Sequence, residues 1–238
     1  MYSSPFDFFD KIYCINLPRS KDRWSTVSKV FERVGILDKV ERIWADPPAQ
    51  SFKMSNFNYP AGEFGVCLSH GKALVKAMHD SAKNFLLFED DIDFINGGIE
   101  RLTEAINEIP SNWDIFYLGG NPREPLHKIS KNLSKTGFFY GGFSYAVNSK
   151  SFFEIYSQHL NYISKPFPTS TYDYSLALYA AEHNAYCIDP YVCKNIAGHS
   201  IIRNAHRDYD KVISELWEEF GSHNIDKPKP SLQDALKK

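Results

Sequence analysis

The sequence predicts a single α/β domain whose central sheet is mostly parallel and flanked by helices. The first observation is the continuous apolar run at 85–88 (Phe-Leu-Leu-Phe), which is typical of a strand buried on both faces. The second is that strand-like runs and amphipathic helical segments follow one another along the chain. The third is the length of 238 residues, which suits one sizeable domain. We assign residues 1–226 to this domain and expect a disordered tail at 227–238.

The first half of the chain predicts its elements from apolar patterns and from the residues that interrupt them. Residues 11–17 form a strand-like run that is stopped by Pro18. Ser20 is a natural N-cap for the next helix, which Gly35 ends. A short strand at 40–44 precedes a polar, aromatic stretch at 50–61, which we expect to be a surface excursion. The following elements are a helix from 62 with one apolar face, the strand at 85–88 and a helix at 99–109.

The second half begins with a strand at 113–120 that is closed by glycines. Residues 121–136 are predicted to be a polar loop. An alternating strand at 141–147 leads to a short helix that Ser149 is expected to cap. The remaining predicted elements are a helix that starts at 171–176, a last strand or bridge at 189–193 and an amphipathic helix at 209–220.

Composition narrows the range of partners and compartments. The net charge of −2 and the scattered basic residues give no nucleic-acid footprint, so we expect no nucleic-acid partner. No apolar run is long enough to span a bilayer, and residues 1–5 do not resemble a secretory signal. We therefore expect a cytoplasmic protein, with peripheral membrane association left open. The irregular spacing of the cysteines predicts free thiols in a reducing compartment, at Cys14, Cys67, Cys187 and Cys193.

Four carboxylates follow the buried strand within five residues: Glu89, Asp90, Asp91 and Asp93. Open α/β sheets bind ligands at the carboxyl edge of their strands, which is where these acids fall. Adjacent acids repel one another, and a divalent metal with oxygen ligands would compensate their charge. The run therefore predicts a metal site that can also hold an anionic ligand such as a diphosphate. The alternative is a strand that runs into a solvated acidic turn.

Four further residues are ambiguous when they are considered alone. Arg19 and Arg23 lie near a predicted helix N-terminus, which suits a phosphate-bearing ligand but equally suits a surface pair without a ligand. His70 lies in an otherwise apolar helix, where a hydrogen-bonded structural histidine is the more common case. Asp173 begins a helix, and its spacing favours a cap over a general base.

Several segments, in order, resemble glycosyltransferase family 25, which includes lipooligosaccharide and collagen galactosyltransferases. They span about residues 10–200, and five blocks in the right order are fairly specific. Residues 46–61 and those beyond Gly198 depart from the pattern and leave the acceptor class open. The matching segments are 15–23 (INLPRSKDR), 62–70 (GEFGVCLSH), 87–91 (LFEDD), 113–119 (WDIFYLG) and the later pair 145–147 (YAV) and 172–176 (YDYSL).

The resemblance implies a GT-A-like fold and the inverting transfer of a hexose, galactose or glucose, from a UDP-sugar with Mn²⁺ or Mg²⁺. Its metal contacts would be Asp91 first and Glu89 second, with Asp93 and His199 as weaker candidates. Asp173 would be the base that accepts the proton of the acceptor hydroxyl. The expected nucleotide-sugar contacts are Asn16, Leu17, Arg19, Arg23, Ser69, His70 and Asp90.

The sequence leaves alternatives open for the acceptor and for the class of reaction. The acceptor would be a glycan or the hydroxylysine of a collagen-like chain, and the sequence does not choose between them. A metal-dependent phosphohydrolase or nucleotidyltransferase could use the same acids, but no P-loop or DxDxT motif is present. A catalytically silent nucleotide- or glycan-binding module is the other alternative, against which the intact run of carboxylates argues.

Overall fold

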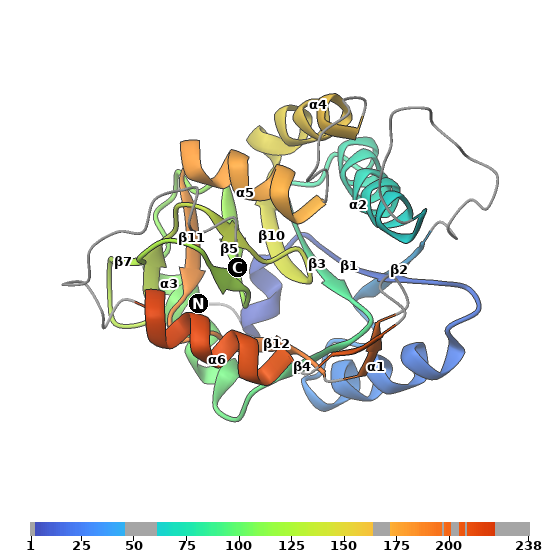
Figure 1. Ribbon diagram of the computed structural model, residues 1–238, viewed down its shortest axis with the longest axis horizontal. Coiled ribbons are helices and arrows are strands. Elements are labelled where there is room, and N and C mark those ends of the chain that lie inside the picture. Colours follow the sequence, from blue (N-terminus) through green and yellow to red (C-terminus); the bar gives the residue numbers. More distant parts are fainter. Residues whose placement is uncertain are drawn as a thin grey trace.

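The computed structural model describes residues 3–45, 61–163, 172–196, 198–200, 205–207 and 209–221. Its centre is an eight-stranded sheet in which most strands run in one direction, whereas β10 and β8 run against them (Figure 1). In spatial order the strands are β2 (Val40–Trp44), β1 (Lys11–Asn16), β3 (Asn84–Glu89), β10 (Ser144–Asn148), β5 (Ile115–Tyr117), β11 (Ala185–Ile188), β8 (Leu133–Lys135) and β7 (His127–Lys128).

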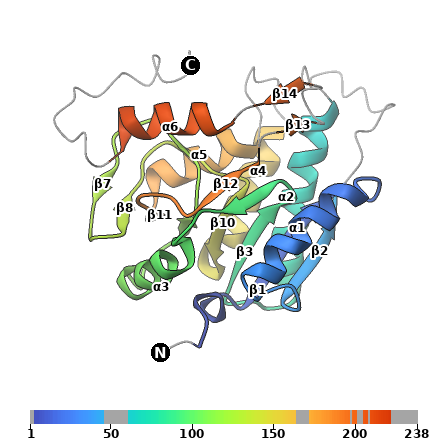
Figure 2. The same cartoon turned by 90° about the horizontal axis from the view of Figure 1, so that it is seen from below.

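Helices cover both faces of this sheet, so the predicted α/β architecture is confirmed (Figure 2). They are α1 (Lys21–Arg33), α2 (Ala61–His79), α3 (Gly98–Glu108), α4 (Phe152–Ile163), α5 (Tyr172–Glu182) and α6 (Tyr209–Phe220), with 3-10 turns η1 (Pro5–Phe8) and η2 (Ser149–Ser151). Short antiparallel pairs join β4 (Ile92–Phe94) to β12 (Cys193–Asn195), β13 (Gly198–Ser200) to β14 (Ala205–Arg207) and β6 (Asn121–Pro122) to β9 (Phe139–Tyr140). Among the described helices, none is long and apolar enough to cross a membrane.

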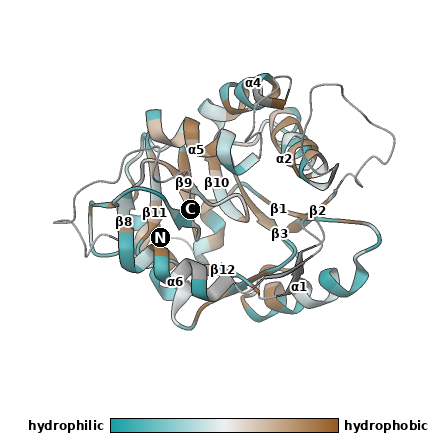
Figure 3. Ribbon diagram, in the orientation of Figure 1, coloured by the Kyte–Doolittle hydropathy of each residue, from teal (hydrophilic) through white to brown (hydrophobic). Residues whose placement is uncertain are grey.

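The core is divided by the sheet into two hydrophobic clusters. Successive residues of a strand point to opposite faces, so Tyr13 and Ile15 of β1 pack toward α2, α4 and α5, whereas Ile12 and Cys14 pack toward α1 and α3. Residues 85–88 of β3 are fully buried between the two clusters, as their continuous apolar sequence predicted. The central strands are accordingly among the hydrophobic parts of the ribbon, together with segments of the helices that cover them (Figure 3). The cluster on each face fixes β3 and therefore the acids that follow it.

Most predicted elements lie where the sequence placed them, but two caps differ. Ser20 is the residue before α1, yet its side chain makes no capping hydrogen bond. Ser149 does not cap the following helix; it is the first residue of η2, and the Asn148 side chain accepts a hydrogen bond from the Lys150 amide instead. Asn148 takes this role because its backbone is still extended at the end of β10, as an N-cap requires.

Two predictions about loops and late strands are wrong. Residues 121–136 are not only a loop, because they contain β6, β7 and β8, and β8 pairs with β11 at the edge of the central sheet. The predicted strand at 189–193 is displaced: β11 ends at Ile188, and β12 starts only at Cys193. The four cysteines are buried and free, as expected. The excursion predicted at 50–61, except Ala61 in α2, and the predicted tail at 227–238 lie outside the described residues.

A buried histidine joins two helices and should make stability depend on pH. His159 of α4 donates from Nε2 to the Cys67 carbonyl of α2 over 3.0 Å, and burial lowers its pKa to about 4. Unfolding returns that pKa to its usual value near 6.5. The stabilisation that the neutral, buried His159 gives the folded state is therefore fully present above pH 6.5 and is lost as pH falls to 4, because the unfolded chain binds the proton first. We expect the free energy of unfolding to fall by about 1.4 kcal/mol per pH unit in this window from His159 alone.

Urea denaturation between pH 7 and pH 4 measures this slope. His159→Gln should flatten it by about one proton, whereas His127→Gln, which replaces an exposed histidine of β7, should leave it as in the unaltered chain. Equal slopes for all three proteins would show that His159 is protonated to the same extent in the folded and unfolded states.

Candidate functional site

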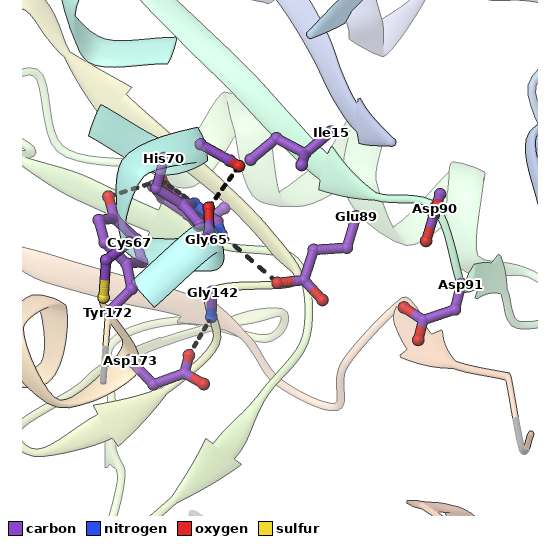
Figure 4. A network of polar contacts seen from close by, with 12 residues as sticks. Ile15, Gly65, Cys67, His70, Glu89, Asp90, Asp91, Gly142, Tyr172 and Asp173 are labelled. Carbon is purple, nitrogen blue, oxygen red and sulfur yellow. Dashed lines mark hydrogen bonds and ion pairs between the residues drawn. The ribbon is translucent and has the colours of Figure 1, made fainter. Parts of the chain in front are cut away.

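The acidic run lies at the carboxyl edge of the parallel strands, as predicted. Glu89 is the last residue of β3, and Asp90 and Asp91 form the turn into β4. Because β1, β2 and β3 are parallel neighbours, their last residues Asn16 and Trp44 lie at the same edge as Glu89. The side chains divide there: Glu89 points toward His70, whereas Asp90 and Asp91 lie apart from it (Figure 4).

Asp90 and Asp91 share one arginine. Arg23, in the first turn of α1, places Nη2 2.6 Å from a carboxylate oxygen of each. Asn16 of β1 donates from Nδ2 to the other oxygen of Asp90, and Asn195 of β12 donates to Asp91 over 3.1 Å. The cation that the adjacent acids require is therefore supplied in part by the chain itself. Two aspartates against one arginine still leave a negative balance at this edge.

Burial and repulsion by neighbouring acids raise the pKa values of Asp90, Glu89 and Asp173. Burial raises the pKa of Asp90 to about 6, although Arg23 and the amide of Asn16 oppose this shift. The pKa of Glu89 is raised by burial and by the charge of Asp91. The pKa of Asp173 is raised by burial and by the charge of Glu89. The charge of Asp91 thus acts on Glu89, and the charge of Glu89 acts on Asp173, which links the two sides of the site electrostatically.

His70 is a buried, neutral residue that also contacts the acid cluster. Burial lowers its pKa to about 3, so the neutral ring donates from Nε2 to Glu89 over 3.4 Å and accepts at Nδ1 from the Tyr145 hydroxyl over 3.0 Å. The Tyr172 hydroxyl lies 2.6 Å from that of Tyr145, and the Tyr172 ring stacks on His70 with centroids 4.0 Å apart. His70 is therefore both a hydrogen-bonded structural histidine and a direct support of Glu89.

Asp173 lies in the first turn of α5 and faces the Glu89 side of the site (Figure 4). Its Oδ1 accepts a hydrogen bond from the Gly142 amide over 2.8 Å. A Cβ atom at position 142 would lie only 2.6 Å from that oxygen, so the close approach requires glycine. The Gly142 amide therefore fixes the carboxylate of Asp173 in place.

The other predicted site residues lie at varying distances from this cluster. Arg19 is exposed in the turn after β1, and Leu17, half-buried, accepts a hydrogen bond at its carbonyl from the Ser20 amide. The Ser69 hydroxyl is buried and donates to the Gly65 carbonyl within α2. Asp93 pairs with Arg33 on the solvent side. His199 lies in β13 opposite His206 of β14, and only its backbone is described.

A metal site built from protein ligands alone is not formed in the described part of the chain. No group of three or more His, Cys, Asp or Glu side chains gathers there closely enough to hold an ion. Mg²⁺ in nucleotide-using enzymes is commonly held by one or two carboxylates together with substrate phosphates. Asp91 fits this second kind of site, in which the ligand set is completed by the substrate, whereas Glu89, the second predicted ligand, is directed to His70.

The sequence did not reveal several members of the site. Asn195 reaches it from β12, and no local pattern marks it. Tyr145 and Tyr172 lie in segments that match the family, but the sequence predicted no role for either side chain. Arg42 donates to the Asn16 side chain from β2, and its guanidinium lies between the rings of Trp24 and Trp44. A signal for Arg42 and Trp44 existed, because both lie toward the carboxyl end of a strand that is parallel to β1.

Comparisons with known proteins agree with the motifs. No family model matches the chain. It is 30% identical over 93 residues to human "Inactive glycosyltransferase 25 family member 3", covering 36% of this chain and 16% of that protein. It is 24% identical over 163 residues to mouse "Procollagen galactosyltransferase 2", covering 59% of this chain and 26% of that protein. The chain thus spans about a quarter or less of the length of these curated relatives.

The fold has a counterpart among solved structures. A glycosyltransferase involved in the glycosylation of the major capsid of PBCV-1 superposes with a TM-score of 0.50 at 12% identity, covering 87% of this chain and 98% of that chain. At that identity the likeness concerns the fold alone, and it confirms the predicted GT-A-like α/β arrangement. In sequence, the chain resembles glycosyltransferase family 25, as the ordered motifs predicted.

Proposed function

We propose that this chain is a glycosyltransferase that moves a hexose, most simply galactose, from a UDP-sugar to a hydroxyl group with inversion at the anomeric carbon. The observation that carries the proposal is the division of the acidic run at the end of β3. Asp90 and Asp91 face Arg23, whereas Glu89 faces His70 on the side of Asp173. Inverting transfer needs a site for the leaving diphosphate on one side of the sugar and a base for the acceptor hydroxyl on the other side.

The charge balance supports a divalent cation, Mn²⁺ or Mg²⁺. Arg23 is shared by Asp90 and Asp91, so the edge would repel a diphosphate unless a further cation were bound. Asp91 would hold the ion together with diphosphate oxygens, while Asp93 is engaged by Arg33. Glu89 would be a second ligand only if its side chain turned away from His70 toward Asp91. His199 remains a further candidate ligand. When bound, the ion would neutralise the charge that develops on the leaving diphosphate.

Asp173 would act as the base. It is held by the Gly142 amide at the start of α5, and the charge of Glu89 contributes to its raised pKa. A base with a raised pKa is better matched to removal of a proton near neutral pH. The acceptor is proposed to be a glycan or the hydroxylysine of a collagen-like chain, the second because a relative is named a procollagen galactosyltransferase.

The test is hydrolysis of a panel of UDP-sugars with and without Mn²⁺. We expect slow release of UDP from one sugar, dependent on Mn²⁺ and strongly reduced in Asp91→Asn, which keeps the side-chain shape but removes the charge. Asp93→Asn is the matched control from the same acidic run, because that carboxylate pairs with Arg33, and it should retain the activity. Release of UDP that is independent of both Mn²⁺ and Asp91 would contradict the proposed metal site.

A catalytically silent nucleotide- or glycan-binding module is the second candidate. Two observations favour it: the human relative is named inactive, and the described residues gather no complete set of metal ligands. Such a module would be stabilised against heat by UDP with Mn²⁺ yet release no UDP from any sugar with any acceptor. Release of inorganic phosphate in place of UDP would instead indicate a phosphohydrolase.

A further inference from the structure

An arginine lies between two tryptophans beside the acidic edge. The guanidinium carbon of Arg42 is 4.4 Å from the ring centroid of Trp24 on α1 and 3.8 Å from that of Trp44 at the end of β2. Arg42 also donates to the Asn16 side chain, which holds it from a third direction. Planar guanidinium groups stack well on indole rings, so the three side chains form one ordered stack.

Trp44 is the member of this stack that is open to solvent. Trp44 is 52% exposed although Arg42 covers one side of its ring. The exposed part of the ring offers a flat apolar surface on which another flat group can stack. The Arg42 stack holds the Trp44 ring in a fixed orientation, so little conformational entropy would be lost when a flat ligand covers it.

The position of Trp44 relative to the acids matches the dimensions of a nucleotide. Trp44 pairs in register with Asn16 of β1, and Ile15 of β1 pairs with Glu89 of β3. Neighbouring strands are about 4.8 Å apart, so Trp44 and the acids are separated by two strand spacings, about 10 Å. That separation suits a nucleobase at β2, its ribose over β1 and its diphosphate at the end of β3.

We propose that Trp44, backed by Arg42 and Trp24, is the platform on which the base of the nucleoside-diphosphate sugar stacks. This inference rests on the proposed function and assigns the donor's base to one end of the site. Hydrogen bonds connect the two ends without a break, because Arg42 donates to Asn16, Asn16 donates to Asp90, and Asp90 pairs with Arg23. Binding of the base would therefore order the residues that face the diphosphate.

Calorimetric titration of the full chain in Mn²⁺ with UDP and with inorganic diphosphate tests the platform. We expect Trp44→Ala to weaken UDP binding by about 10- to 100-fold, the range that loss of one base–aromatic stack gives, and to leave inorganic diphosphate binding unchanged. Trp44→Phe keeps a flat ring and should retain most of the UDP affinity. Phe153→Ala removes another exposed aromatic side chain, on α4, and should bind UDP like the unaltered chain.

The outcomes separate this inference from the proposed function. Unchanged UDP affinity in Trp44→Ala, with sugar release intact, would overturn the platform and leave the transferase standing. Unchanged UDP affinity with a raised KM for an acceptor would also overturn it and would assign Trp44 to the acceptor sugar. If the unaltered chain bound neither UDP nor diphosphate, both the platform and the proposed function would fall. Equal loss of UDP and diphosphate binding would overturn the platform, because the effect would not be specific to the base.

Discussion

Asp173→Asn is expected to lower the turnover number of sugar transfer by about 10²- to 10⁴-fold, the usual contribution of a general base, and to leave UDP affinity unchanged. Asparagine has the same shape, and its carbonyl oxygen can still accept from the Gly142 amide. It cannot take a proton from the acceptor. Steady-state release of UDP, with water as acceptor where no better one is known, measures the turnover, and calorimetry measures the affinity.

A second variant tests whether the position of this carboxylate matters as well as its charge. Gly142→Ala would place Cβ 2.6 Å from Oδ1 of Asp173, so the carboxylate must move. Gly137→Ala is the matched control, since its Cβ would meet the flexible carboxylate of Glu124 at 2.2 Å. We expect reduced turnover only in Gly142→Ala. If Asp173→Asn turned over at the rate of the unaltered chain, the base would be another residue, with Glu89 the nearest alternative.

The sequence was sufficient for the parts of the fold that local patterns determine. The continuous apolar run at 85–88 identified β3, and the apolar faces of α1 and α2 identified the helices that cover it. The carboxyl edge of β3 then followed from the parallel order of the sheet, which placed the acids correctly. These predictions succeeded because burial restricts the residues that face the core, as a continuous apolar run where both faces of a strand are buried and as a helical period where one face of a helix is buried.

The parts that failed depend on contacts between distant segments. β11 has four residues and β8 three, too short for a pattern, and they are strands because each completes the hydrogen bonds of a neighbour in the sheet. The division of the acidic run was also not predictable. Whether Asp90 and Asp91 meet a metal or Arg23 depends on how α1 packs against the sheet, which the turn sequence does not specify.

Arg23→Met is expected to reduce the free energy of unfolding by about 1.5 to 3 kcal/mol, because it leaves the buried carboxylate of Asp90 without its partly exposed cation. Asp90 is only 8% exposed, and Asn16 alone would then stabilise its charge. Methionine keeps the length and apolar stem of the side chain, so lost packing contributes little. Urea denaturation at pH 7 measures the change.

Two companions assign the loss to the buried pair. Arg33→Met removes an ion pair to Asp93 in which the arginine side chain is 55% exposed, and it should cost at most about 1 kcal/mol. Arg23→Met combined with Asp90→Asn should recover most of the loss, since the neutral amide no longer needs a cation. A cost in Arg23→Met no larger than in Arg33→Met would mean that the charge of Asp90 is stabilised without Arg23. The acids would then be free to hold a metal ion, and Arg23 would not be the cation that keeps them together.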